Sequence, residues 1–127
     1  MRTRPARNEK PLFWVGSSKR DLLEFPEDVV DNIGYALVVV QHGGHPPSAK
    51  GWKGIGPGVS EIVEDDVSGT YRAVYTVRFR QAIYVLHAFQ KKSPSGIRTA
   101  RPDIELVLQR LKVAKRDYEA RYGKEGQ

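Results

Sequence analysis

The chain has 127 residues, no cysteine and a formal net charge of +6. This length suits one domain, and the lack of cysteine excludes disulfide frameworks, thiolate zinc sites and cysteine nucleophiles. No apolar run approaches the roughly 20 residues of a membrane-spanning helix, and the first residues lack the apolar core of a signal peptide. We therefore expect a soluble protein of the cytoplasm with no membrane contact.

The positive charge is concentrated in the middle of the chain. Residues 67–102 contain no aspartate or glutamate, so this block carries +7 and the rest of the chain sums to −1. Such a block is typical of a surface that binds a polyanion, above all nucleic acid, although it could also be a solvated sheet face. Its basic residues are Arg72, Arg78, Arg80, Lys91, Lys92, Arg98 and Arg101.

The N-terminal third predicts a strand followed by two helices. Residues 1–10 are polar and basic and read as a disordered arm, before a single domain over 11–123 and a disordered tail over 124–127. LFWVG, 12–16, predicts a strand, and Ser17 or Ser18 can cap a short helix. Pro26 suits the start of a second helix, whose apolar stripe stops at Gly43.

The segment HPPSAKGWKGIGPG, 45–58, predicts a loop because of its prolines and glycines. Lys50 and Lys53 flank Trp52, so the lysines could contact RNA phosphates while the indole stacks on a base. Alternatively, the indole covers the core. His42 and His45 lack neighbouring metal-ligand side chains, so no metal site and no cofactor are expected.

Three strands and a helix complete an α+β fold. VSEIV at 59–63, TYRAVYTVRF at 70–79 and AIYVLHAF at 82–89 predict an antiparallel meander, because their connections are short. With the N-terminal strand they form an antiparallel sheet, accompanied by two N-terminal helices and one C-terminal helix. Thr99 can cap that last helix, which carries two surface ion pairs four residues apart, Lys115 with Glu119 and Asp117 with Arg121.

The register of the last two strands decides where His87 points. If Arg80 and Gln81 form a two-residue turn, Arg72 lies opposite Phe89 and Val74 opposite His87. Arg72 is then diagonal to His87, with Lys91 and Lys92 just beyond the strand end, whereas a three-residue loop would turn His87 to the other face. The face shared with His87 would comprise Arg72, Val74, Thr76, Arg78, Ile83, Val85 and Phe89, and the opposite face Tyr71, Ala73, Tyr75, Val77, Phe79, Tyr84, Leu86 and Ala88.

The motifs YRAVY and LHAFQKKS, preceded by the strand, the paired helices and the glycine-rich loop, resemble the RelE/HigB-like superfamily of bacterial toxin–antitoxin toxins. The likeness is strongest to the phage-derived HigB-like branch and covers residues 11–122. It implies a small RNase-like α+β fold and cleavage of messenger RNA on the ribosome. It also implies silencing by a cognate HigA-like antitoxin in a toxin–antitoxin hetero-oligomer.

The resemblance carries over to single residues unevenly. Arg72 matches the arginine that contacts the scissile phosphate, and Lys91 or Lys92 matches the basic position after the last core strand. The two lysines of the preceding strand are missing, since VSEIVED has Glu61 where a cation is expected. The base-stacking tyrosine has no counterpart after Ser93. These departures favour a competing reading, a toxin that is no nuclease, such as a ParE-like gyrase inhibitor.

Metal-free RNA cleavage sets the chemical requirements of the site. The 2′-hydroxyl is the nucleophile, so the protein must supply a base, an acid and cations around the phosphate. Our hypothesis is that Arg72 with Lys91 or Lys92 holds the phosphate while His87 transfers a proton, although a lysine crowded by like charge could be the base. A core histidine and solvated lysines are the structural alternatives. Further RNA contacts are predicted at Lys50, Lys53, Arg78, Arg98 and Arg101.

Overall fold

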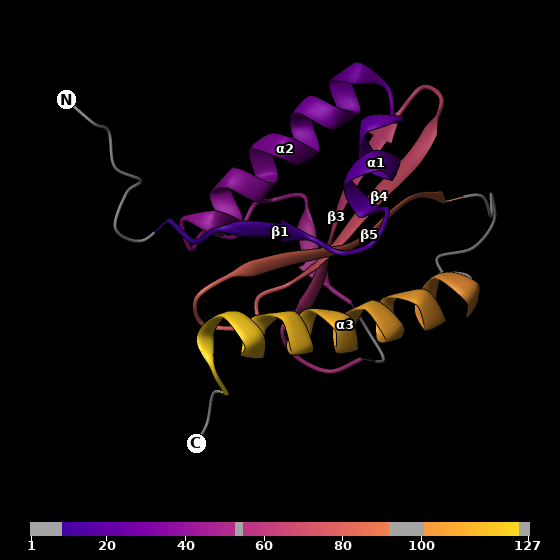
Figure 1. The fold of residues 1–127 in the computed structure, drawn as a ribbon. Helices are drawn as coiled ribbons and strands as arrows, with labels where there is room; N and C mark the ends of the chain where they lie inside the picture. The colour runs from indigo at the N-terminus through magenta and orange to yellow at the C-terminus, as the bar shows by residue number, and fades with distance from the viewer. Residues whose placement is uncertain (1–8, 53–54, 92–100, 125–127) are drawn as a thin grey trace.

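The computed structural model describes residues 9–52, 55–91 and 101–124, and within them it forms one five-stranded sheet between two layers of helix. Two helices cover one face of the sheet and the long C-terminal helix crosses the other (Figure 1). None of the helices described is long and apolar enough to cross a membrane. The elements are β1 (Leu12–Trp14), α1 (Ser18–Leu23), α2 (Glu27–Gln41), β2 (Ala49–Gly51), β3 (Val59–Asp66), β4 (Gly69–Thr76), β5 (Ile83–Lys91) and α3 (Arg101–Tyr122).

The α+β class is confirmed, but the sheet is larger than predicted and is mixed. Its strand order is β1-β5-β4-β3-β2, and β1 runs parallel to β5 with Leu12 opposite Ile83. The prediction of an antiparallel N-terminal strand is therefore wrong. The prediction of a loop throughout 45–58 is wrong as well, because Ala49–Gly51 pairs with β3. Three residues are too few to display the alternation by which a strand is recognised in a sequence.

The N-terminal helices begin and end close to the predicted residues. Pro26 directly precedes α2 with an extended ψ of 148°, and Gly43 follows the helix with φ of +86°, a conformation that glycine adopts without strain. The predicted cap of α3, Thr99, lies outside the described residues, as do 1–8 of the predicted arm and 125–127 of the predicted tail.

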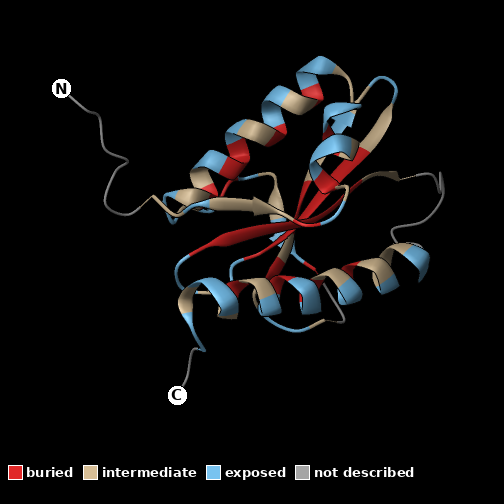
Figure 2. Cartoon of the chain, viewed as in Figure 1, coloured by how far each residue is buried: buried red, intermediate tan, exposed pale blue. Residues whose placement is uncertain are grey.

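Both faces of the sheet carry a hydrophobic core (Figure 2). Ile33 and Leu37 of α2 pack on one face, and Val107 and Tyr118 of α3 pack on the other. Each fully buried aliphatic side chain of this kind contributes about 1.5–3 kcal/mol. The central strands β4 and β5 are therefore buried from both sides, and a charged side chain on them requires a partner.

The register of β4 and β5 is confirmed near His87 but not beyond it. Arg72 lies opposite Phe89 and Val74 opposite His87, as predicted. The next pair is Tyr75 with Val85, so a bulge at Leu86 inserts one residue into β5. The strands also end earlier than predicted, and residues 77–82 form a longer connection instead of a two-residue turn.

The bulge changes the predicted faces of β5. Ile83 and Val85 pack in the core under α1 and α2, whereas Leu86 packs in the core under α3. Placing Ile83 and Val85 on the face of His87 was therefore wrong. Separating Tyr84 and Leu86 from that face was wrong as well, because the inserted residue shifts the alternation by one position. The longer connection and the bulge offset each other, which is why His87 keeps its predicted partner.

Candidate active site

Charged side chains form a row across β2, β3 and β4 on the face of the sheet that carries α3. Lys50 pairs with Glu61 across β2 and β3. Arg72 lies on β4 two positions from the partner of Glu61 on that strand. Arg72 Nη1 donates to Glu61 Oε1 at 2.8 Å and Oε2 at 3.0 Å, and Lys50 Nζ is 3.9 Å from Oε2. Arg72 is 7% exposed and Glu61 3%, so water is largely excluded from this ion pair.

Glu61 is a site residue to which the sequence assigned no role. It was recognised only as a departure from the expected lysine, yet it is the counter-ion of Arg72. The sequence does contain a sign of this role. Glu61 shares a face of β3 with Val59, which is buried, so an acid is predicted to point into the core. A buried carboxylate needs a cation within reach, and an arginine on the neighbouring strand can provide it.

A side chain of α3 holds the His87 ring in place. Its Nε2 lies 2.7 Å from Asp103 Oδ1 in the first turn of α3, and its ring stacks on Phe89 at 4.7 Å between centroids. An ionised carboxylate only accepts hydrogen bonds, so Nε2 carries the proton and Nδ1 of the neutral ring is an acceptor. Asp103 has no role in the sequence analysis, because its contact with β5 has no signal in the sequence.

Two buried polar atoms of this site have no hydrogen-bond partner within the described part of the chain: Arg72 Nε and His87 Nδ1. The two side chains occupy diagonal positions of β4 and β5. Leaving a buried polar group unpaired costs about 1–3 kcal/mol, so such atoms in one place indicate a function. One is a donor and the other an acceptor, and a ligand with an acceptor next to a hydroxyl would satisfy both.

Lys91 is the last residue of β5 and pairs with Thr70 of β4. It lies two positions beyond the residue that pairs with Arg72. Desolvation lowers the pKa of Lys91, and the positive charges of Arg72 and Lys50 lower it further, whereas Glu61 opposes them. Lys91 is the position at which the alternative of a crowded lysine as the base would apply. Lys92 lies outside the described residues.

The other predicted RNA contacts do not form one group. Lys50 is exposed beside Glu61, and Arg101 is exposed at the start of α3. Arg78 donates to the carbonyl oxygens of Pro57 at 2.9 Å and Ile55 at 2.7 Å, so it fastens the loop before β3 and lies apart from the row of charges. Lys53 and Arg98 lie outside the described residues.

Trp52 settles one alternative left open by the sequence. The residue is buried and packs in the core under α3. The interpretation of its indole as a base-stacking surface is therefore wrong, because a nucleotide has no access to the ring.

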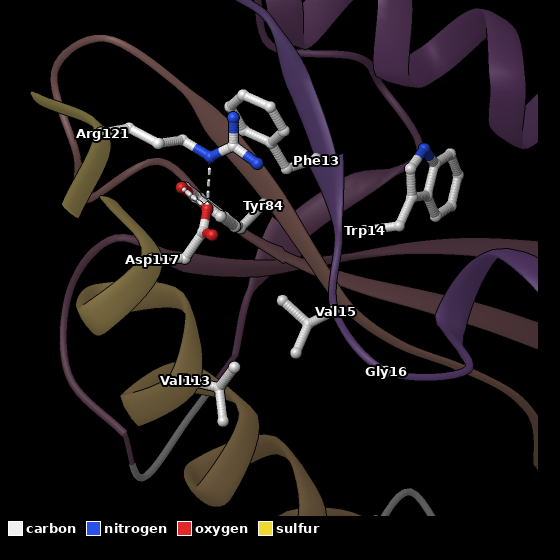
Figure 3. A pocket seen from close by; sticks show the side chains of 8 residues that line it. All are labelled: Phe13, Trp14, Val15, Gly16, Tyr84, Val113, Asp117 and Arg121. Atoms are coloured by element: carbon white, nitrogen blue, oxygen red, sulfur yellow. Dashed lines mark hydrogen bonds and ion pairs between the residues drawn. The ribbon is translucent and has the colours of Figure 1, made fainter. Parts of the chain in front are cut away.

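A hollow of about 180 Å³ lies between β1 and α3, away from these residues (Figure 3). Its polar groups already bind one another: Tyr84 donates to Asp117 at 2.6 Å, and Arg121 Nε donates to the same oxygen at 2.7 Å. The Arg121 guanidinium also covers the Phe13 ring at 4.1 Å. This cluster fastens the end of α3 to the sheet.

Comparison with known proteins identifies the family. The sequence profile of the family described as "Phage derived protein Gp49-like" matches residues 20–112, well over half of the chain. The chain belongs to the Gp49-like family. That family is a RelE/HigB-like toxin family of toxin–antitoxin systems, which confirms the resemblance at the level of the superfamily. No curated protein matches the chain.

The Gp49-like match covers the charged residues of the candidate site. Lys50, Glu61, Arg72, His87 and Asp103 all lie within the matched residues. The hollow in Figure 3 depends on residues outside them, at both ends of the chain. A function that the Gp49-like family shares therefore has its candidate residues on the α3 face of β2 to β5.

Proposed function

We propose that this protein is the toxin of a toxin–antitoxin module and that it cleaves messenger RNA on the ribosome without a metal ion. Family membership supports a toxin, and the acid-free block of residues 67–102 supports a nucleic-acid substrate. The observation that carries the proposal is that Arg72 Nε and His87 Nδ1, beside Lys91, have no hydrogen-bond partner among the described residues. A ribose phosphate has the complementary groups, because a phosphate oxygen accepts and a 2′-hydroxyl donates.

The reaction needs one proton acceptor and one proton donor. The 2′-hydroxyl gives its proton to His87 Nδ1 while its oxygen forms a bond to the adjacent phosphorus. The bond from phosphorus to the 5′ oxygen breaks, and Lys91 gives a proton to that oxygen. Arg72 donates to the phosphate oxygens as their charge grows. The products are a 2′,3′-cyclic phosphate and a 5′-hydroxyl, and each proton transfer contributes about 10²–10⁴-fold.

Two acidic residues have supporting roles in this proposal. Asp103 fixes the tautomer and orientation of His87, which keeps Nδ1 free to accept a proton. Glu61 neutralises Arg72 until a phosphate competes for the guanidinium. His87 Nδ1 is buried, so the substrate reaches it only when the surroundings of the ring move while the hydrogen bond between Nε2 and Asp103 is kept. A cognate antitoxin would bind the toxin and keep it inactive.

One observation favours a second candidate, a toxin that is no nuclease and acts on a protein such as gyrase. The charged groups at the centre of the site are already paired, Arg72 with Glu61 and His87 with Asp103, and three of these four side chains are buried. A chain that never opens these pairs would keep Arg72 and His87 from a phosphate. It would then act through its outer surface.

Mapping transcript ends after induction separates the two candidates. We expect the wild type to produce new 5′ ends within translated messages. His87→Gln should remove them, whereas His42→Gln, an exposed histidine at the end of α2, should leave them unchanged. Intact transcripts together with double-strand DNA breaks would refute the nuclease and support the gyrase route.

A further inference from the structure

An open groove lies between α3 and the connection from β4 to β5, and the functional site described above does not use it. It encloses about 410 Å³, within the range of ligand pockets. Its floor is apolar and its rim is basic. The residues that line it are Arg78, Phe79, Leu108, Leu111, Lys112 and Lys115.

The floor of this groove is fixed before anything binds. Phe79 stacks on Tyr118 at 4.8 Å and meets Tyr84 edge-on at 5.7 Å, which holds its ring in place. Leu111 is buried beside it, but Leu108 on the preceding turn of α3 is 42% exposed. A large aliphatic side chain so exposed beside an apolar hollow is a feature of protein-binding surfaces.

The rim carries three cations and, among the described residues that line it, no carboxylate. The predicted ion pair between Lys115 and Glu119 does not form, whereas the one between Asp117 and Arg121 does, at 2.7 Å. Lys112 and Lys115 thus make no ion pair within the described part of the chain. Arg78 bonds only backbone carbonyls among the described residues, so its charge is also uncompensated.

We propose that this groove binds an acidic amphipathic segment of a partner protein. Leucine-like side chains of the partner would fill the floor around Leu108 and Leu111, while its carboxylates would face Arg78, Lys112 and Lys115. An RNA strand would satisfy the cations but would leave the aliphatic floor without apolar contacts, so a peptide suits both features better. The preformed walls lower the entropic cost of binding. This inference does not depend on the nuclease activity.

The test uses the full chain and a fluorescent helical peptide of about 16 residues, roughly four turns, with leucines on one face and glutamates on the other. We expect saturable binding in fluorescence anisotropy. Lys112→Glu and Leu108→Asp should each weaken it by about tenfold or more. The matched controls are on the same helix but outside the groove: Arg116→Glu makes the same charge change, and Val113→Asp alters an equally exposed apolar side chain.

Three outcomes would overturn the inference. The first is binding that does not saturate up to about 1 mM peptide, because such an affinity is weaker than that of most specific complexes. The second is equal binding of a peptide whose leucines are replaced by serine, because charge alone would then explain the affinity. The third is a short single-stranded RNA that binds more tightly than the peptide and loses that affinity in Lys112→Glu. Thermal melting of each variant checks that a lost signal does not reflect unfolding.

Discussion

Arg72 on β4 and Glu61 on β3 form an ion pair at 2.8 Å, and both side chains are more than nine-tenths buried. Moving two charges from water into a protein interior costs several kcal/mol per ion before their attraction offsets it. In a small domain such a pair therefore needs a reason beyond stability. In the proposed mechanism that reason is function, since Glu61 holds the guanidinium in place until a phosphate replaces the carboxylate.

The first prediction concerns the stability of this pair. Arg72→Gln or Glu61→Gln should each lower the free energy of unfolding by about 3–5 kcal/mol, because the remaining charge is buried without its partner. The double variant should lose much less than the sum of the two. Urea denaturation measures the free energy of unfolding of all three variants. In the control Lys50→Gln, which removes an exposed charge, the loss should be less than about 1 kcal/mol. Additive losses would contradict the coupling.

The second prediction concerns Asp103 as the group that positions His87. In Asp103→Asn the amide can donate to Nε2, which would move the ring proton to Nδ1 and remove the proposed base. RNA cleavage should fall by about 10²–10⁴-fold. The ¹⁵N chemical shifts of the His87 ring report the tautomer directly, and Glu105→Gln, an exposed acid on the next turn of α3, is the control. A lower melting temperature with an unchanged tautomer would mean that Asp103 only anchors α3.

The third prediction is a dependence of stability on pH. The hydrogen bond from Tyr84 lowers the pKa of Asp117, and the one from Arg121 lowers it further. A lowered pKa in the folded state means that Asp117 stabilises the fold above its unfolded pKa of about 3.9, and that this stability is lost as the pH falls through the folded pKa. The melting temperatures of wild type and Asp117→Asn should therefore differ at neutral pH and converge in acid. Glu119→Gln should show no such convergence, and parallel curves for Asp117→Asn would refute the linkage.

The fourth prediction tests the wall of the groove. Gly58 has φ of +89°, and a Cβ there would lie 2.5 Å from Arg78 Cγ. Gly58→Ala should cost about 1–3 kcal/mol from backbone strain, with a further cost from displacing Arg78. Gly34→Ala in α2 meets no atom within 4 Å and should instead stabilise by up to about 1 kcal/mol. Equal effects in chemical denaturation would mean that the loop before β3 is not fastened as described.

The sequence predicted every element except β2, and it predicted the pairing of Arg72 with Phe89, because local signals determine both. The alternation in YRAVY and LHAF defines two strands, and Pro26 and Gly43 delimit a helix whatever surrounds it. The bulge at Leu86 had no such signal. It depends on how two strands fit between helices on both faces, which no short window of sequence contains.

The candidate site was predicted in part for the same reason. Arg72, His87 and Lys91 were found because they lie on or near one strand pair, whose register can be worked out. Asp103 is sixteen residues from His87 and reaches it only because α3 packs on the sheet. Glu61 was noticed and then set aside as a missing cation. Its value as a counter-ion emerges only when β3 is placed beside β4.

The most direct test of the account is cleavage in a purified translation system, using a message whose cut site is known from end mapping and a copy with a 2′-deoxyribose at that site. The proposed reaction uses the 2′-hydroxyl as nucleophile, so the normal message should be cut to a 2′,3′-cyclic phosphate and the deoxy copy should remain whole. Equal cleavage of both messages, or cleavage of neither, would contradict the role assigned to Arg72, His87 and Lys91.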